Sequence, residues 1–568
     1  MKKRARTLGV TVALGCAMTG IATVPARADT PAVTAKYGGR ITVGIFDSFS
    51  GFCVGNNLAN SSLMAARTVY ETLFEKTVTG AMVGLLATGS SKSADLKTWT
   101  ITLRRGVKFH DGTPFNATAV LANFTAIRGL DFLESGGKRT FTLGTAIPFS
   151  ANINNVTAIT PYSVRFTLDR PQNDFTNTLY ASGRFFMRAP SQLVDSDTCA
   201  EKPIGTGPFK SLKWTANSMV VVRNKSYWRR NPVTNAALPY LDRITFQNVK
   251  EASQRAAAVR RGTYDAAMFS SATDSTFILD LRSRRNIVRE YKSPPEYYTA
   301  LWLNQGKAGS PFANKDARLA VAYAFDAASF LKVRMRGQGQ VPDSIVGPSN
   351  TMYSHNRFIA YNLPKAREAA LRYKNATGKS VEFTIPADTS IASQNNAKYL
   401  KQMMAKAGIV MNVLTEETAV IISRAFNAAQ ARNDYDALPL LLLEGTDVSF
   451  NVPFLVTNTF ASNSTNPTRV LSRNFGSLLN LTRHTDTVVD RYLFGGQAAS
   501  TAAAAQIRYR KATQRIQSEA LIVPTVRQYY TLFLSPSLRG VGQVQLQRGK
   551  TQRIVTNWGI DWTGVWKA

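Results

Sequence analysis

The stretch that decides the fold is Lys97-Thr-Trp-Thr-Ile-Thr-Leu-Arg-Arg-Gly-Val-Lys-Phe-His-Asp-Gly-Thr-Pro-Phe-Asn-Ala117. Between Trp99 and Leu103, apolar residues alternate with threonine, which is the pattern of a strand with one buried face. Gly106 and Gly112 mark turns, because glycine reaches backbone angles that cost other residues free energy. The stretch therefore predicts a strand followed by turns.

A helix is expected directly after these turns. Asn116 is a good N-cap residue, and Ala117–Ala126 has a helical composition. His110 lies beside Asp111, a pair of residue types that also occurs in catalytic sites. Since no nucleophile is close to them in the sequence, we expect a structural turn here.

This stretch resembles the hallmark segment of the family 5 extracellular solute-binding proteins, the receptors of ABC importers for dipeptides, oligopeptides, nickel chelates and related solutes. Other motifs of that family follow in the same order along nearly the whole chain. The segment Val69–Phe74 resembles the first helix of the family. The other matches are Tyr162–Pro171, Gly205–Phe209, Asn224–Trp228, Pro239–Phe246, Gly262–Asp265, Leu301–Asn304, Arg318–Asp326 and Gly408-Ile409.

The length and the resemblance together predict an α/β fold with two lobes. About 540 residues after the N-terminal segment exceed what one hydrophobic core usually supports, and strands alternate with helices. The resemblance implies a two-lobed periplasmic binding protein of type II, large and cluster C-like, with a ligand cleft between the lobes and an extra subdomain in the first lobe. We expect lobe I over 29–295, a crossing at Pro294-Pro295, lobe II over 296–527, and a return to lobe I over 528–568.

The N-terminus predicts export. Lys2, Lys3, Arg4 and Arg6 precede a mostly apolar run, and Ala26-Arg27-Ala28 is a small-x-small cleavage site. We therefore expect a cleaved signal peptide over 1–28 and a periplasmic protein. A lipoprotein anchored through Cys16 is the alternative, although the apolar run before Cys16 is short.

The chain is strongly basic, with 69 Lys and Arg against 36 Asp and Glu. Residues 1–28 hold five basic and no acidic side chains, so a chain cleaved there carries a net charge of +28. The basic residues are scattered, and no nucleic-acid-binding module is recognisable. We expect a solvated basic surface, drawn to the anionic face of a membrane rather than to nucleic acid.

Two cysteines remain beyond Cys16. The resemblance places Cys53 and Cys199 in the same lobe, which is compatible with one disulfide in an exported protein. Two buried free thiols are the alternative. With only three scattered histidines, the sequence predicts no zinc site and no cofactor.

The segment Glu444-Gly-Thr-Asp-Val-Ser-Phe-Asn-Val-Pro-Phe-Leu455 is the strongest candidate for ligand binding. In peptide-binding relatives the matching aspartate receives the amino terminus of the peptide, and the resemblance places Asp447 on it. A carboxylate in a site that excludes water pairs strongly with an ammonium group. A helix or turn cap is the alternative role for Asp447.

The sequence departs from the peptide-binding relatives at two places. Glu444 replaces an aromatic residue, and the loop after the strand Val381–Ile385 lacks a basic residue that dipeptide-binding relatives can present to the ligand carboxylate. Asp388 stands in that loop instead. We therefore hypothesise an acidic cleft for a cationic or amine-bearing solute; the alternative is that Asp388 and Glu444 face solvent.

Phe52 and Trp302 are the aromatic candidates for the cleft. Phe52 follows the first strand, where family members often contact the ligand, and Trp302 follows the expected crossing. Aromatic rings can hold a peptide side chain or the face of a cation. Core packing is the alternative for both.

The expected function is ligand capture without catalysis. The sequence contains no nucleophile elbow, no phosphate-binding loop and no His-Glu-x-x-His motif. The resemblance implies a monomer that binds a small molecule or short peptide and delivers it to ABC permease subunits at the inner membrane. A receptor for a nickel or haem chelate and a sensory receptor are the alternatives.

Overall fold

In the computed structural model, Met1–Ala35 and Lys36–Ala568 form separate units, and the signal peptide predicted over 1–28 lies outside the described residues. The structure describes residues 35–568 except 55–59, 131–145, 296, 349, 356–358, 427–434, 444–447, 458–478, 543–544, 548–549, 552–555 and 557–558.

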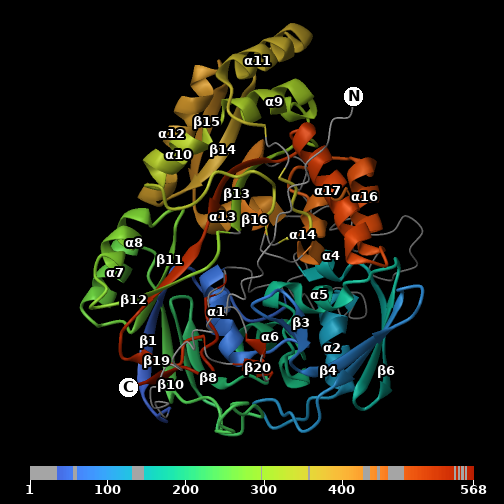
Figure 1. The fold of residues 1–568 in the computed structure, drawn as a ribbon, viewed down its shortest axis with the longest axis vertical. Coiled ribbons are helices and arrows are strands. Elements are labelled where there is room, and N and C mark those ends of the chain that lie inside the picture. The colour runs from blue at the N-terminus through green and yellow to red at the C-terminus, as the bar shows by residue number, and fades with distance from the viewer. Residues whose placement is uncertain are drawn as a thin grey trace, which may run out of the picture. The chain divides into compact units, whose positions relative to one another are not determined.

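A seven-stranded sheet combines the first strand of the fold with a strand from near the C-terminus (Figure 1). Its central strand β1 (Arg40–Ile45) runs parallel to both neighbours, β10 (Arg243–Asn248) and β11 (Ala266–Ser270). The outer strands are antiparallel to their neighbours; they are β9 (Ser218–Arg223), β8 (Phe209–Thr215), β18 (Tyr530–Leu534) and β12 (Arg289–Lys292).

The stretch quoted first forms part of a four-stranded antiparallel sheet. Strand β5 (Thr98–Leu103) buries Trp99, Ile101 and Leu103 on one face, as the alternation predicted. Its sheet contains β4 (Ala87–Lys92), β7 (Ser163–Leu168) and β6 (Ile153–Thr160). Helix α2 (Ala117–Ile127) follows, and the Asn116 side chain accepts a hydrogen bond from the Ala119 N–H at 3.1 Å, which confirms the predicted cap.

Two further sheets use residues from the second half of the chain. Strand β13 (Tyr297–Leu303) lies between β16 (Ala437–Leu443) and β17 (Val523–Gln528), antiparallel to both. Strands β14 (Glu382–Asp388) and β15 (Val410–Glu416) form a parallel pair. The chain therefore changes sheets between Lys292 and Tyr297, and again between Gln528 and Tyr530. The short pairs are β2 (Phe74–Lys76) with β3 (Met82–Gly84), β19 (Leu538–Arg539) with β22 (Trp566–Lys567), and β20 (Gln545–Gln547) with β21 (Lys550–Thr551).

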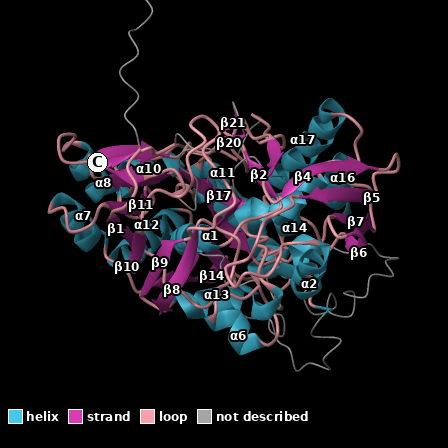
Figure 2. Cartoon of the chain, turned by 90° about the horizontal axis from the view of Figure 1, so that it is seen from below, coloured by secondary structure: helices cyan, strands magenta, loops and turns pink. Residues whose placement is uncertain are grey.

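Helices cover these sheets, and α16 and α17 run side by side (Figures 1 and 2). Besides α2, the helices of the described residues are α1 (Asn60–Val69), α4 (Ala146–Ser150), α5 (Phe175–Tyr180), α6 (Ser196–Glu201), α7 (Ala252–Arg260), α8 (Ser275–Arg282), α9 (Lys315–Ala324), α10 (Ala327–Arg334), α11 (Leu363–Thr377), α12 (Ile391–Lys406), α13 (Thr418–Phe426), α14 (Val448–Leu455), α16 (Thr487–Gln497) and α17 (Ala502–Ser518), with short 3-10 turns at Ala181–Gly183, Pro190–Gln192 and Pro311–Ala313.

Two helix expectations require correction. The motif Val69–Phe74 is not helical beyond Val69, the last residue of α1, whose carbonyl accepts a hydrogen bond from the Gly207 N–H at 2.9 Å. The pattern from Asp316 to Phe330 predicts one helix but forms two. Phe325 is extended, and Asp326 caps the second helix through the Ser329 N–H.

Candidate functional site

The parallel strands of the seven-stranded sheet end on one edge. Phe46 follows β1, Lys250 lies two residues beyond the last residue of β10, and Ser270 ends β11. Tyr530 pairs with Ser270 in the antiparallel register of β18 and β11. We call these four residues the carboxyl edge; in α/β proteins, ligands bind outside the carboxyl ends of such strands, where the strand order switches direction.

The chain crosses between the seven-stranded sheet and the three-stranded sheet β16-β13-β17 after Lys292 and after Gln528, and both crossings pass beside the carboxyl edge. The Tyr530 N–H donates to Ser293 Oγ at 2.9 Å, and the Ser293 N–H donates to the Tyr530 carbonyl at 2.8 Å. The Tyr530 ring lies 5.4 Å from the Tyr297 ring and 6.3 Å from the Phe46 ring, between centroids. An aromatic cluster therefore joins the loop after β1 to both crossings.

A buried arginine fixes the carboxyl edge from inside. The Arg255 guanidinium donates to the carbonyls of Val249 (2.7 Å), Lys250 (2.8 Å) and Met268 (3.1 Å), and it pairs with Asp274 at 2.6 Å. Its side chain is 1% exposed. A single guanidinium thus holds the ends of β10 and β11 in one arrangement, using the fixed fork of donors that arginine offers.

The same guanidinium also faces Phe46, with its carbon atom 5.4 Å from the ring centroid. The next residue, Asp47, accepts hydrogen bonds from the N–H and the hydroxyl of Ser61, at 2.6 and 2.7 Å. These contacts attach the loop after β1 to the first turn of α1 and limit the freedom of Phe46.

Asp388 is the only acidic candidate of the ligand site that the structure describes. It ends β14, so the residues Pro386–Asp388, expected in a loop, belong to the strand. The Asp388 carboxylate is partly buried and accepts the Ser390 N–H at 2.8 Å, and Ser390 caps α12. The carboxylate therefore supports a turn and does not simply face solvent.

The acidic candidates Glu444 and Asp447 lie outside the described residues. Their segment follows directly after β16, whose last residue, Leu443, pairs with Tyr298 in β13. Tyr298 is next to Tyr297, which contacts the aromatic cluster at the crossings.

Phe52 and Trp302 are both fully buried. The Phe52 ring packs against Trp214 and Phe49, with centroid distances of 5.0 and 5.9 Å. The Trp302 Nε1–H donates to the Leu440 carbonyl at 3.2 Å, and its ring lies 6.4 Å from Phe454. These contacts are those of the core-packing alternative that the sequence left open.

Cys53 and Cys199 are bonded to each other in the structure, with a Cα–Cα distance of 4.8 Å. This bond joins the loop before α1 to α6. Arg188, itself 2% exposed, donates to the carbonyls of Phe52 and Cys53 at 2.8 and 3.0 Å.

His110 lies in a turn, as expected. The Gly112 N–H donates to the Phe109 carbonyl at 2.9 Å, and the Thr113 side chain and N–H both contact Asp111. The imidazole bonds through Nε2 to the Gly207 carbonyl at 2.9 Å, which connects this turn to another family motif.

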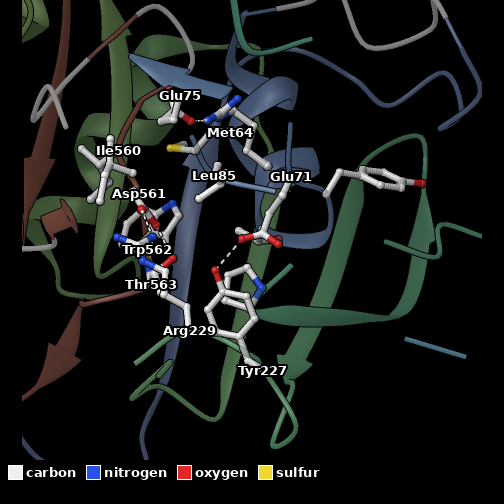
Figure 3. Close-up of a pocket in the computed structure, with 15 residues that line it drawn as sticks. Met64, Glu71, Glu75, Leu85, Tyr227, Arg229, Ile560, Asp561, Trp562 and Thr563 are labelled. Atoms are coloured by element: carbon white, nitrogen blue, oxygen red, sulfur yellow. Dashed lines mark hydrogen bonds and ion pairs between the residues drawn. The ribbon is translucent and has the colours of Figure 1, made fainter. Parts of the chain in front are cut away.

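A small cavity lies apart from the carboxyl edge, between α1, the loop after β9 and the C-terminal residues (Figure 3). The Glu71 carboxylate accepts hydrogen bonds from Tyr227 (2.6 Å), Trp228 (2.8 Å) and Thr206 (2.8 Å). Burial raises the pKa of Glu71, while these hydrogen bonds oppose the rise. With a volume of about 30 Å³, the cavity has room for a water molecule and not for an organic solute.

Ion pairs line this cavity. Arg67 pairs with Glu75, and Arg229 Nη1 lies 3.6 Å from Asp561 Oδ2 (Figure 3). The second pair ties the C-terminal segment to the loop after β9, so the contacts are structural in kind.

Within the part of the chain that the structure describes, no group of three His, Cys, Asp or Glu side chains is arranged to hold a metal ion. Over the same residues, every helix is too short or too polar to span a bilayer.

Comparison with known proteins identifies the family. The sequence model of the bacterial extracellular solute-binding proteins, family 5 (middle), matches residues 81–466, more than half of the chain. This chain belongs to that family. Its resemblance to the family, drawn from the motifs above, is confirmed.

Two characterised relatives differ in ligand. The chain is 26% identical to the nickel-binding periplasmic protein of Escherichia coli K12 over 389 residues, 64% of this chain and 69% of the relative. It is 29% identical to the glutathione-binding protein GsiB of Salmonella choleraesuis over 355 residues, 62% of this chain and 65% of the relative. The chain thus spans about two thirds of the length of these relatives.

Solved structures show the fold. The DppA protein of Helicobacter pylori in complex with the peptide STSA has a TM-score of 0.75 at 21% identity, covering 94% of this chain and 98% of DppA. NikZ of Campylobacter jejuni in complex with Ni(L-His) has a TM-score of 0.71 at 18% identity, covering 92% and 97%. The fold is therefore the mixed α/β, two-lobed fold of periplasmic binding proteins.

Sequence reasoning missed four residues of the site: Phe46, Lys250, Arg255 and Tyr530. The sequence pattern extends the first strand to Phe46 and predicts a helix over 252–261, without a role for Arg255. The run Ala252–Arg260 carries Arg255 on the side that also holds Ala252, Ala256 and Val259, all buried. A cation on the apolar side of a helix was the available signal.

Proposed function

We propose that this protein is a periplasmic receptor that binds a peptide-like or amine-bearing small solute and delivers it to the permease subunits of an ABC importer. The family membership and the two-lobed fold support this proposal. The observation that carries it is the carboxyl edge, where parallel strands end beside both crossings of the chain. Hinge closure of two lobes around a ligand is the usual action of such a fold.

The proposed amine site consists of Asp447, Glu444 and Asp388. By resemblance, Asp447 corresponds to the position that receives a peptide amino terminus in relatives, and its segment follows β16 in the sequence, whose last residue, Leu443, pairs with Tyr298. A carboxylate in a closed cleft favours an ammonium group over a neutral one. Phe52 and Trp302 support the site through packing around it.

The protein acts as a monomer and performs no chemistry in this proposal. Residues 29–295 with 528–568 form lobe I, and 296–527 form lobe II. The two changes of sheet, after Lys292 and after Gln528, support these boundaries. Export with cleavage after Ala28 places the protein in the periplasm.

Isothermal titration against matched panels of amines, zwitterionic peptides and anions tests this function. We expect binding of solutes that carry an amine, and a loss of about tenfold or more in affinity for Asp447→Asn, since a charge-assisted pair contributes about 1.5–3 kcal/mol. Glu417→Gln, at an exposed position, is the control and leaves affinity unchanged. Tight binding of anions alone would contradict the proposal.

A receptor for a nickel chelate is the second candidate, favoured by the similarity to the nickel-binding protein of Escherichia coli. Native mass spectrometry of protein purified from the periplasm distinguishes the two functions. A co-purified mass containing nickel favours the chelate, and a metal-free organic mass favours the amine-bearing solute.

A further inference from the structure

Lys250 reaches from the carboxyl edge to a turn that belongs to another sheet. Its Nζ atom lies 3.1 Å from Thr389 Oγ1, in the turn between β14 and α12. Both side chains are exposed. Among the described residues, no carboxylate forms an ion pair with Lys250.

Hydrogen bonds hold the backbone beside both Lys250 and Thr389. Arg255 holds the Lys250 carbonyl at 2.8 Å. On the other side, the Gln394 amide donates to the Asp388 carbonyl at 2.7 Å, and the Asp388 carboxylate accepts the Ser390 N–H. These hydrogen bonds hold the backbone on each side of the contact between Lys250 and Thr389.

An ammonium group has three donors, and Thr389 accepts one of them. The others can bind a ligand group with acceptor oxygens. The segment 386–391, from the end of β14 to the start of α12, contains no basic residue, and its one charged side chain is Asp388. A solute with positive charge alone meets like charge at Lys250, whereas a carboxylate finds its natural partner there.

We propose that Lys250 binds the carboxylate of a zwitterionic, peptide-like solute, supplying from the carboxyl edge the cation that the segment 386–391 lacks. This inference rests on the proposed function, because the acidic residues bind the amine of the same solute. It narrows the ligand from any amine to a solute that carries an amine and a carboxylate together.

Matched ligand pairs test this role. The probes are dipeptides and their C-terminal amides, which differ only in the carboxylate, titrated into mature protein. We expect wild type to prefer the acid by about tenfold, the difference that a charge-assisted contact produces. Lys250→Gln lowers affinity for the acid about tenfold, leaves the amide unchanged and thereby abolishes the preference.

Two further variants separate ligand recognition from a latch between the sheets. Lys398→Gln, an exposed lysine on α12, retains the preference in full. Thr389→Val removes the hydroxyl but keeps Lys250, so the preference for the acid persists. Each variant is first shown to melt at the wild-type temperature.

Three outcomes overturn the inference. Equal losses for acid and amide in Lys250→Gln indicate a latch, and an unchanged preference places the carboxylate elsewhere. If wild type binds simple amines but no dipeptide, the proposed function stands and Lys250 does not bind a ligand carboxylate. If it binds neither class, the proposed function fails, and this inference with it.

Discussion

His110 shows how one side chain can depend on a single protonation state. Its Nε2–H fits the Gly207 carbonyl, while Nδ1 faces the Gly205 N–H at 3.4 Å and must therefore accept. Adding a proton to Nδ1 would place two donors against each other. Burial lowers the pKa of His110 to about 4, and the nearby Lys210 acts in the same direction.

This pKa gives a pH dependence with a definite sign. An unfolded histidine has a pKa near 6.5, so the unfolded chain takes up the proton first as the pH falls. The stabilisation by neutral His110 is complete above pH 6.5 and is lost progressively toward pH 4. Between pH 6.5 and pH 4, we expect the unfolding free energy of wild type to fall by about 2 kcal/mol more than that of His110→Gln. Urea titrations at both pH values measure this difference. His355→Gln, at an exposed position, is the control; an equal effect of both would contradict the prediction.

The Cys53–Cys199 bond gives a second prediction at the residue scale. It closes a loop with a sequence separation of 146 residues, and a bond across so long a loop restricts the unfolded chain strongly. We expect the double variant Cys53→Ser, Cys199→Ser to lose about 2–5 kcal/mol of unfolding free energy. Dithiothreitol should lower the melting temperature of the wild type and leave the double variant unchanged. Two reactive thiols in unfolded, unreduced mature protein would refute the bond.

At the scale of elements, the sequence predicted those strands and helices that depend on neighbouring residues alone. The alternation of Trp99, Ile101 and Leu103 and the cap at Asn116 each depend on a few neighbours, and both are confirmed. The contact of the Val69 carbonyl with Gly207 at the end of α1 could not be predicted, because the two residues are far apart in the sequence. The same holds for the carboxyl edge, whose members come from four strands.

Arg255 contacts β11, the residues after β10 and Asp274, so its replacement should destabilise all three regions. Lysine at this position keeps the charge but cannot reach three carbonyls and Asp274 at once. We expect Arg255→Lys to lower the unfolding free energy by about 2–4 kcal/mol, since buried polar groups lose their partners. Hydrogen exchange should rise at the ends of β10 and β11.

The matched control is Arg260→Lys, on the same helix. Its ion pair with Asp280 is largely exposed, at 3.2 Å and 40% side-chain exposure, so a change below about 1 kcal/mol is expected. Comparable losses of unfolding free energy for both variants would mean that the hydrogen bonds of Arg255 to the ends of β10 and β11 do not stabilise the protein more than an exposed ion pair does.

For the whole molecule, one cluster of buried hydrophobic residues includes members of both predicted lobes. It combines residues of the four-stranded sheet, such as Trp99, with residues of the second half, such as Trp302 and Phe450. The contact is direct: the Phe149 ring stacks on Phe450 at 4.8 Å and lies 5.8 Å from Phe454. The sequence could not reveal this, because periodicity shows which residues are buried but not against which partner.

A shared core predicts energetic coupling between positions some 300 residues apart in the sequence. We expect Phe149→Ala and Phe450→Ala each to cost about 3 kcal/mol of unfolding free energy, and the double variant to cost less than the sum by about 0.5–1.5 kcal/mol. Phe269, in a separate cluster, should be additive with Phe149 when changed to alanine. Additivity of Phe149 and Phe450 would contradict the prediction, because it would show that the stacked pair contributes no coupling energy to the folded protein. Coupling would show that residues of the two predicted lobes stabilise each other directly through this aromatic contact.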